Sequence, residues 1–254
     1  MKITVLAENT CLRTDLQAEH GLSLLIETQG LTILFDMGQT DLFVRNAERL
    51  NIELSKVDFA VVSHGHYDHG GGFHAFRRLN PTAPVYIRPQ AFEPYYNRSG
   101  KYIGLDTSIF QDPGLVLCHD GFSPAENITL CSCDARDIGA SGLWRRDGES
   151  MVPDDFRHEQ YMLIHENERR VLVSGCSHRG ILNIVSHFQP DVLVGGFHLS
   201  HIQPGQELNC LSSQLNNFST EYYTCHCTGL PQYQHMVEHM DRLHYLSTGQ
   251  TITI

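Results

Sequence analysis

Short apolar runs alternate with amphipathic stretches in the first third of the chain. Runs rich in β-branched residues, bounded by glycine and polar residues, predict five strands. These strands cover residues 3–6, 22–26, 31–35, 57–62 and 85–87. Apolar positions at helical spacing predict helices over residues 41–50 and 72–80. This order of strands and helices is typical of a layered α/β fold.

The same alternation returns after residue 160. We expect strands over residues 161–165, 170–174, 192–195 and 221–224, and helices over residues 180–188, 206–217 and 232–242. Between the two regular parts, residues 88–159 lose periodicity and are rich in Pro, Gly, Asp and Tyr. We therefore expect a single domain over residues 1–254, in which residues 88–159 form an irregular cap or lid that shapes the substrate pocket. An insertion without a role in the pocket is the alternative.

The bulk composition indicates a cytoplasmic protein with reduced thiols. A hydrophobic fraction of 41% is ample for a core, and no segment approaches the ~20 consecutive apolar residues that cross a bilayer, so we expect no membrane partner. The first eight residues reach polar side chains too early for a secretory signal. Without export, the eight cysteines are expected to form no disulfide.

The charge balance excludes nucleic acid as a partner. The net charge is −11 with only 18 Lys and Arg residues, whereas nucleic-acid binders need clustered basic side chains. Divalent ions in a site would reverse the local field, so a small anionic substrate is compatible with this charge. The sequence does not indicate an oligomeric state.

The sharpest chemical signal is His64-Gly65-His66-Tyr67-Asp68-His69, directly after the apolar run at 57–62. His64 and His66 are expected to share one metal ion, with Gly65 supplying the backbone freedom for the turn. Asp68 and His69 are expected to hold a second ion. We therefore predict two divalent ions, zinc in the first place, with iron and manganese as alternatives. Asp68 is also the predicted catalytic residue.

Later strands also end in histidine. His178 and His226 are the predicted remaining ligands, one for each ion, because each follows a buried strand and precedes a glycine-containing turn. His198, at a third strand end, has three open roles: metal ligand, donor to the substrate, or partner that orients another ligand.

Three further residues have two interpretations each. Asp36 follows the strand at 31–35 and either fixes the tautomer of a ligating imidazole or caps the next helix. Cys176 is either a soft metal donor or redox-sensitive thiol, or else a buried structural thiol. The same alternatives apply to Cys225 and Cys227. Arg179 either binds a substrate anion or caps a helix.

The motif that begins at His64 resembles the hallmark of the metallo-β-lactamase superfamily, whose fold is an αββα sandwich. More narrowly, several segments resemble the dihydropteroate-synthase-like branch, which includes methanopterin-precursor synthases that join a dihydropterin to a ribofuranosylaminobenzene phosphate. These segments are residues 19–23, 34–39, 46–47, 63–72, 175–178, 195–198 and 226–229. The resemblance implies the α/β fold, with two mixed sheets flanked by helices, and the metal ions.

One departure from the superfamily concerns the carboxylate that bridges the two metals in hydrolytic relatives. This chain has Ser174-Gly175-Cys176-Ser177-His178 at that strand end, with no carboxylate. Cys176 and His178 are the candidates to replace it. The separate histidine that relatives carry after the lid has His158 as its candidate.

The leading functional prediction is a metallo-hydrolase that uses a metal-bound hydroxide to attack an ester, thioester or phosphoester of a small, anionic substrate. A pterin-precursor condensing enzyme is the first alternative. Tyr95, Tyr96, Tyr102 and Trp144 would then stack a planar ring, unless they form a small core of their own. A metal or redox sensor without turnover is the second alternative.

Overall fold

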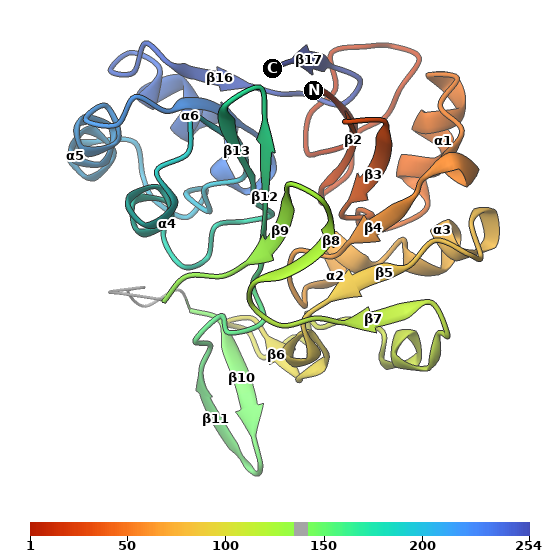
Figure 1. Cartoon of the computed structure of the whole chain (residues 1–254). Helices are drawn as coiled ribbons and strands as arrows, with labels where there is room; N and C mark the ends of the chain where they lie inside the picture. Colours follow the sequence, from red (N-terminus) through yellow and green to blue (C-terminus); the bar gives the residue numbers. More distant parts are fainter. Residues whose placement is uncertain (135–141) are drawn as a thin grey trace. The chain divides into compact units, whose positions relative to one another are not determined.

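The computed structural model describes residues 1–134 and 142–254, and these form two compact units (Figure 1). Unit 1 contains residues 1–119, 142–159 and 247–254, and unit 2 contains residues 120–134 and 160–246. The part of the predicted cap at residues 135–141 lies outside the described residues.

Unit 1 is built on a seven-stranded mixed sheet in the order β17-β1-β2-β3-β4-β5-β7. The strands are β1 (Lys2–Ala7), β2 (Ser23–Thr28), β3 (Leu31–Phe35), β4 (Phe59–Val61), β5 (Val85–Ile87), β7 (Leu115–Leu117) and β17 (Thr251–Thr253). The pairs from β17 to β3 are antiparallel, and those from β3 to β7 are parallel. The parallel part aligns the ends of β3 and β4, because Phe35 pairs with Val61.

Helices cover the apolar core of unit 1. They are α1 (Leu42–Arg49), α2 (Tyr67–Gly70) and α3 (Phe73–Leu79), with the 3-10 segment η1 (Leu54–Lys56). Phe43 and Ala47 of α1 lie one turn apart on its buried face and belong to the same core cluster as Phe73 and Phe76 of α3. Leu34 of β3 is part of this cluster, so the strand that leads to Asp36 is held by apolar packing.

The segment at 88–159, expected to be irregular, contains regular structure. In unit 1 it holds the 3-10 segments η2 (Pro89–Phe92) and η3 (Thr107–Gln111), strand β7, and a small sheet in the order β11-β10-β6. That sheet consists of β6 (Tyr95–Tyr96), β10 (Trp144–Asp147) and β11 (Ser150–Pro153). The strands are two to four residues long, and such short runs carry too few positions to show alternation in the sequence. The lid role of this segment stays a prediction.

Unit 2 is built on a second seven-stranded mixed sheet in the order β16-β15-β14-β13-β12-β9-β8. Its strands are β8 (Phe122–Ala125), β9 (Ile128–Cys131), β12 (Tyr161–Glu166), β13 (Arg169–Val173), β14 (Val192–Gly195), β15 (Glu221–Thr224) and β16 (Leu243–Tyr245). Strands β13 to β16 are parallel, so their carboxyl ends lie at one edge of the sheet.

The helices of unit 2 are α4 (Ile181–Phe188), α5 (Gln206–Leu215) and α6 (Leu230–Met236), with the 3-10 segment η4 (His226–Thr228). Ile184 and Phe188 of α4 lie one turn apart and join Leu208 of α5 and Met236 of α6 in one core with Leu193 of β14. The spacing of apolar residues in the sequence predicted all three helices, although their first and last residues differ from the prediction.

The end of the chain differs from the prediction. The helix expected over 232–242 is α6, which ends at Met236, and the missed strand β16 follows it. The short strand β17 was also missed; two of its three residues are exposed, and it pairs with β1. Among the described residues, no helix combines the length and the apolar character that crossing a bilayer requires.

Candidate metal centre

In unit 1 the histidine motif occupies the loop between β4 and α2, and Gly65 lies where the loop passes the backbone of Ala91. A Cβ at Gly65 would lie 2.3 Å from the Ala91 carbonyl oxygen and 2.8 Å from its Cα. The φ of Gly65 is not among the positive values, so the expectation that it supplies torsional freedom was wrong. Glycine is required here because two backbone segments approach each other closely.

The three imidazoles of the motif converge in the interior of unit 1. His64 and His69 are fully buried, and His66 is 5% exposed. The ring centroid of His64 lies 4.6 Å from that of His66 and 4.1 Å from that of His69. Asp68, which is 8% exposed, lies with His69 on the short helix α2. The structure therefore gathers all four predicted motif donors in one unit.

Asp36, directly after β3, is hydrogen-bonded to the motif and to the residue before it. Its Oδ1 accepts a hydrogen bond from the Ser63 backbone N–H at 2.7 Å, and its Oδ2 accepts one from the Ser63 hydroxyl at 2.7 Å. His69 Nδ1 donates to Oδ2, also at 2.7 Å. This bond places the lone pair of His69 on Nε2, the tautomer that a metal ligand needs. The N-cap residue of α1 is Asp41, so Asp36 does not cap that helix.

His158 and Asp154 bring further donors to His66 in unit 1. His158 Nδ1 accepts a hydrogen bond from the Gly65 N–H at 2.9 Å, and its Nε2 donates to Asp154 Oδ2 at 3.0 Å. One ligand atom from each of His66, Asp154 and His158 lies within 4.8 Å of the others, and all three residues are buried. Sequence reasoning missed Asp154. The only local signal was its position four residues before His158.

Burial sets the protonation of this group. Desolvation, reinforced by the neighbouring His158, lowers the pKa of His66 to about 3. Burial alone would raise the pKa of Asp154, but its bond to His158 outweighs this effect and the pKa lies below its usual value. A neutral imidazole beside an ionised carboxylate is the state in which these side chains can bind a cation.

Sequence reasoning also missed the contact between His20 and Asp68. His20 Nε2 lies 3.1 Å from Asp68 Oδ2, and the His20 side chain is 54% exposed while that of Asp68 is 11% exposed. The loop after β1 therefore supplies a titratable group next to the predicted catalytic carboxylate. Nothing in the local sequence around His20 indicated this neighbour, because the contact spans 48 positions of the chain.

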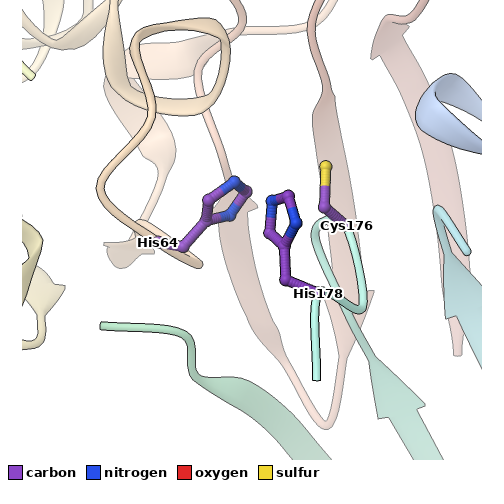
Figure 2. Close-up of side chains that lie close together, drawn as sticks. All are labelled: His64, Cys176 and His178. Carbon is purple, nitrogen blue, oxygen red and sulfur yellow. The ribbon is translucent and has the colours of Figure 1, made fainter. Parts of the chain in front are cut away.

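In unit 2, Cys176 and His178 extend from the turn that follows β13, and Figure 2 shows both side chains on this turn; His64 of unit 1 is the third residue labelled there. Ser177, between them, has a φ of 57°. Cys176 is 3% exposed and His178 is 5% exposed. The buried Arg179 donates from Nη1 to the Cys133 carbonyl oxygen. This bond occupies part of the guanidinium, and the N-cap position of α4 belongs to Gly180.

The loops after β14 and β15 carry the other predicted residues of unit 2. The ring of His198 lies 4.2 Å from that of His178, centroid to centroid. His226 is 1% exposed and begins η4. Burial raises the pKa of the Cys227 thiol, but hydrogen bonds with Cys176 and His198 and the charge of His226 outweigh it, so the pKa lies well below its usual value. That His178 and His226 complete one centre with the motif histidines stays a prediction.

A family model described as the metallo-beta-lactamase superfamily matches residues 16–211, more than half of the chain. The chain belongs to the metallo-beta-lactamase superfamily. The predicted α/β fold class, with two mixed sheets flanked by helices, is confirmed. This superfamily typically binds divalent metals, and the described residues include clusters of His, Cys and Asp that suit such ions.

Similar proteins cover nearly the whole chain. An uncharacterized protein of Methanocaldococcus jannaschii is 28% identical over 242 residues, which are 89% of this chain and 90% of the relative. The 7,8-dihydropterin-6-methyl-4-(beta-D-ribofuranosyl)-aminobenzene-5'-phosphate synthase of the same organism is 26% identical over 278 aligned residues, 96% of this chain and 94% of that protein. The crystal structure of Tm1679, described as a metal-dependent hydrolase of the beta-lactamase superfamily, has a TM-score of 0.86 and 26% identity and covers 100% of this chain and 99% of its own.

Proposed function

We propose that this superfamily member is a metal-dependent hydrolase that cleaves an ester, thioester or phosphoester bond of a small anionic substrate. Superfamily membership supports the reaction class, and so does the similarity to a protein described as a metal-dependent hydrolase. The observation that carries the proposal is the convergence of three buried imidazoles on one loop beside the Asp68 carboxylate, with burial keeping that of His66 neutral.

The residues of unit 1 fit divalent ions. We propose that His64 and His66 hold one ion and that Asp68 and His69 hold a second one, with zinc as the first candidate and iron and manganese as alternatives. His178 and His226 are the proposed remaining ligands. His158 and Asp154 are added as candidate donors, because their ligand atoms lie within 4.8 Å of that of His66.

Bound divalent ions would supply positive charge to an otherwise acidic protein and would lower the pKa of water to about 7. The chain's own residues prepare the site for this chemistry. Asp36 orients His69, and Gly65 lets the loop lie against Ala91. Asp68 is the proposed catalytic residue, since its carboxylate is the group of the motif that can accept a proton near the substrate. His20, 3.1 Å away, is placed to exchange a proton with it.

The first test measures metal and turnover together. Protein purified without added ions is analysed for metal content and assayed on a panel of esters, thioesters and phosphodiesters. We expect close to two ions per chain and turnover that chelation removes, since two donor pairs imply two ions. His66→Ala, His178→Ala and His226→Ala should each lose metal and turnover. The exposed His239 provides the matched control, and His239→Ala should retain both. Metal content without turnover on any substrate would favour a sensor.

A pterin-precursor condensing activity is the second candidate, favoured by the 26% identity to the synthase of Methanocaldococcus jannaschii over nearly the full length of both chains. The aromatic residues support it only in part. Tyr95 is fully buried, its hydroxyl donates to the Gln90 carbonyl, and its ring lies 4.0 Å from that of His158. Tyr95 is thus a core residue, whereas Tyr102 and Trp144 are 42% and 37% exposed. Product formation from a dihydropterin and an aminobenzene phosphate, without ester hydrolysis, would establish the synthase.

A further inference from the structure

We infer that Lys101, together with the hydroxyl of Tyr67, binds the anionic group of the substrate and so selects esters that carry a phosphate group apart from the bond to be cleaved. Both residues belong to unit 1, and Tyr67 lies inside the histidine motif, between His66 and Asp68. The selection of substrates rests on the proposed function, whereas anion binding at Lys101 can be tested without turnover.

Lys101 differs from the other two lysines of the chain in its neighbour. Lys2 and Lys56 each form an ion pair with a glutamate, at 2.6 Å and 2.9 Å. Lys101 is exposed, its Nζ lies 5.5 Å from the centroid of the Tyr67 ring, and it forms no ion pair with any residue that the structure describes. The ring attracts the ammonium group without neutralising its charge. Because the net charge of the chain is −11, this unpaired cation beside the motif gives an anionic substrate a favourable place to bind.

Backbone hydrogen bonds fix Lys101 beside the motif. Residues 101–104 run along the motif, because the Tyr67 N–H donates to the Ile103 carbonyl at 3.0 Å. The Lys101 N–H donates to Asn97 Oδ1 at 3.0 Å, and the Lys101 carbonyl accepts from the Asn97 N–H at 3.0 Å. The backbone of Lys101 is therefore ordered although its side chain is exposed, so anion binding costs little further loss of conformational freedom.

The Tyr67 hydroxyl supplies a second donor next to the ammonium group. Tyr67 is partly exposed, and its hydroxyl has no hydrogen-bond partner among the described residues. A phenol is protonated at neutral pH and donates one hydrogen bond, whereas the ammonium group donates up to three. A phosphate monoester carries a charge of about −1.5 to −2 at neutral pH, so it gains more from this pair than a singly charged carboxylate does.

The first test compares two esters that differ only in the anionic group. Para-nitrophenyl phosphonoacetate and para-nitrophenyl acetate release the same chromophore, and the phosphonate is a stable substitute for a phosphate. We expect the ratio of their kcat/KM values to fall about tenfold in Lys101→Gln, through a higher KM for the phosphonate, because one charge-assisted hydrogen bond is lost. Lys101→Arg should retain most of the ratio. Lys56→Gln is the matched control, since Lys56 is exposed and paired with Glu53, and it should keep the wild-type ratio. A ratio that Lys101→Gln leaves unchanged would mean that Lys101 and Tyr67 form only a surface contact.

The second test needs no turnover. Because the chain has three lysines, protein labelled with carbon-13 lysine gives a simple set of Cε resonances, and Lys101→Arg assigns the one that belongs to Lys101. Phosphonoacetate is titrated into the labelled wild-type protein. We expect a saturable shift of the Lys101 resonance and none for Lys2 and Lys56. No shift at Lys101, or equal shifts at all three lysines, would overturn the anion site. A shift at Lys101 in a protein that hydrolyses no ester would contradict the proposed hydrolase while supporting the anion site.

Discussion

Four residues of the candidate centre, none of them glycine, lie in the left-handed region of the backbone. The φ values are 59° for Asp36, 57° for Ser177, 53° for His198 and 50° for His226. Such conformations cost of the order of 1–3 kcal/mol each and persist where the surrounding structure imposes them. Each of the four lies at or beside a strand end that presents a predicted site residue. They are four of the eleven described non-glycine residues with positive φ, so part of the backbone strain lies at the strand ends that present predicted site residues.

Asp36 is the residue whose single substitution should affect the motif most selectively. Asp36→Asn keeps the shape of the side chain but removes its negative charge. The carboxylate that fixes the His69 tautomer and accepts hydrogen bonds from Ser63 is thereby lost. We expect the affinity for zinc, measured by competition with a chelator, to fall by about 10–100-fold. Asp41→Asn, at an exposed carboxylate paired with Arg45, is the control and should leave the affinity unchanged. Equal affinities of wild type and Asp36→Asn would contradict the orienting role.

Cys131 should be much less reactive than the exposed Cys210. Burial raises the pKa of Cys131 to about 12, so at mildly alkaline pH the thiol remains protonated, and the thiolate is the reactive form. Reactivity of Cys131 should therefore appear only as the pH rises toward this value. Alkylation followed by peptide mass spectrometry measures both rates in one sample. Labelling of Cys131 as fast as that of Cys210 would show that the thiol is not protected.

At the scale of the element, the loop between β4 and α2 shows how a short segment is placed by its neighbours. Tyr67 N donates to the Ile103 carbonyl, and the end of α2 is held through His69, whose carbonyl accepts from Met37 N at 2.7 Å. Gly65 faces the backbone of Ala91 in η2. The loop is thus fixed at its start, middle and end by three different parts of unit 1.

Gly65→Ala should disturb this loop and its metal binding together. The added Cβ would meet backbone atoms, which cannot move aside as a flexible side chain can, and we expect a loss of stability of about 1–3 kcal/mol. Denaturant unfolding and zinc titration measure the two effects. Gly30→Ala is the comparison, because Gly30 has a φ of 79° but open space around it, so this variant should lose stability while binding zinc normally. Normal zinc affinity in Gly65→Ala would refute the requirement for close approach.

At the scale of the whole molecule, unit 1 is assembled from distant parts of the chain. Strand β17 pairs with β1, and the Met1 amino group donates to the Ile254 carbonyl at 3.1 Å. The segment that carries Asp154 and His158 joins the same unit after an excursion of the chain through β8 and β9. Donors near His66 are therefore supplied by segments about ninety residues apart.

Removal of metal should lower the stability of the whole protein. When the free concentration of an ion is 100 times its dissociation constant, binding stabilises the native state by about 2.7 kcal/mol. Chelation removes this contribution. We expect a lower thermal midpoint after chelation of the wild type, restored by added zinc. His66→Ala should show a smaller response, because the proposed ligand is missing. An identical midpoint before and after chelation would mean that the purified protein holds no stabilising ion.

The sequence by itself determined the layered α/β elements and the existence of a metal-binding motif. Period-2 and period-3.6 patterns are local, so strands such as β3 and helices such as α4 were predicted to within a few residues. The motif from His64 to His69 is equally local, because its donors lie within six positions. Short strands such as β16 and β17 left too little pattern, and they were missed.

The tertiary structure alone decided which distant residues meet. The bond from His69 to Asp36, the contact of His20 with Asp68, and the donors Asp154 and His158 beside His66 all join residues that no spacing relates. The same holds for the backbone bond from His198 to Cys227, which depends on the register of β14 and β15. Local pattern reports what one segment buries, whereas these contacts follow from strand pairing and packing across the chain. The local sequence therefore indicated that the site binds metal, whereas the fold determined which distant residues support the motif.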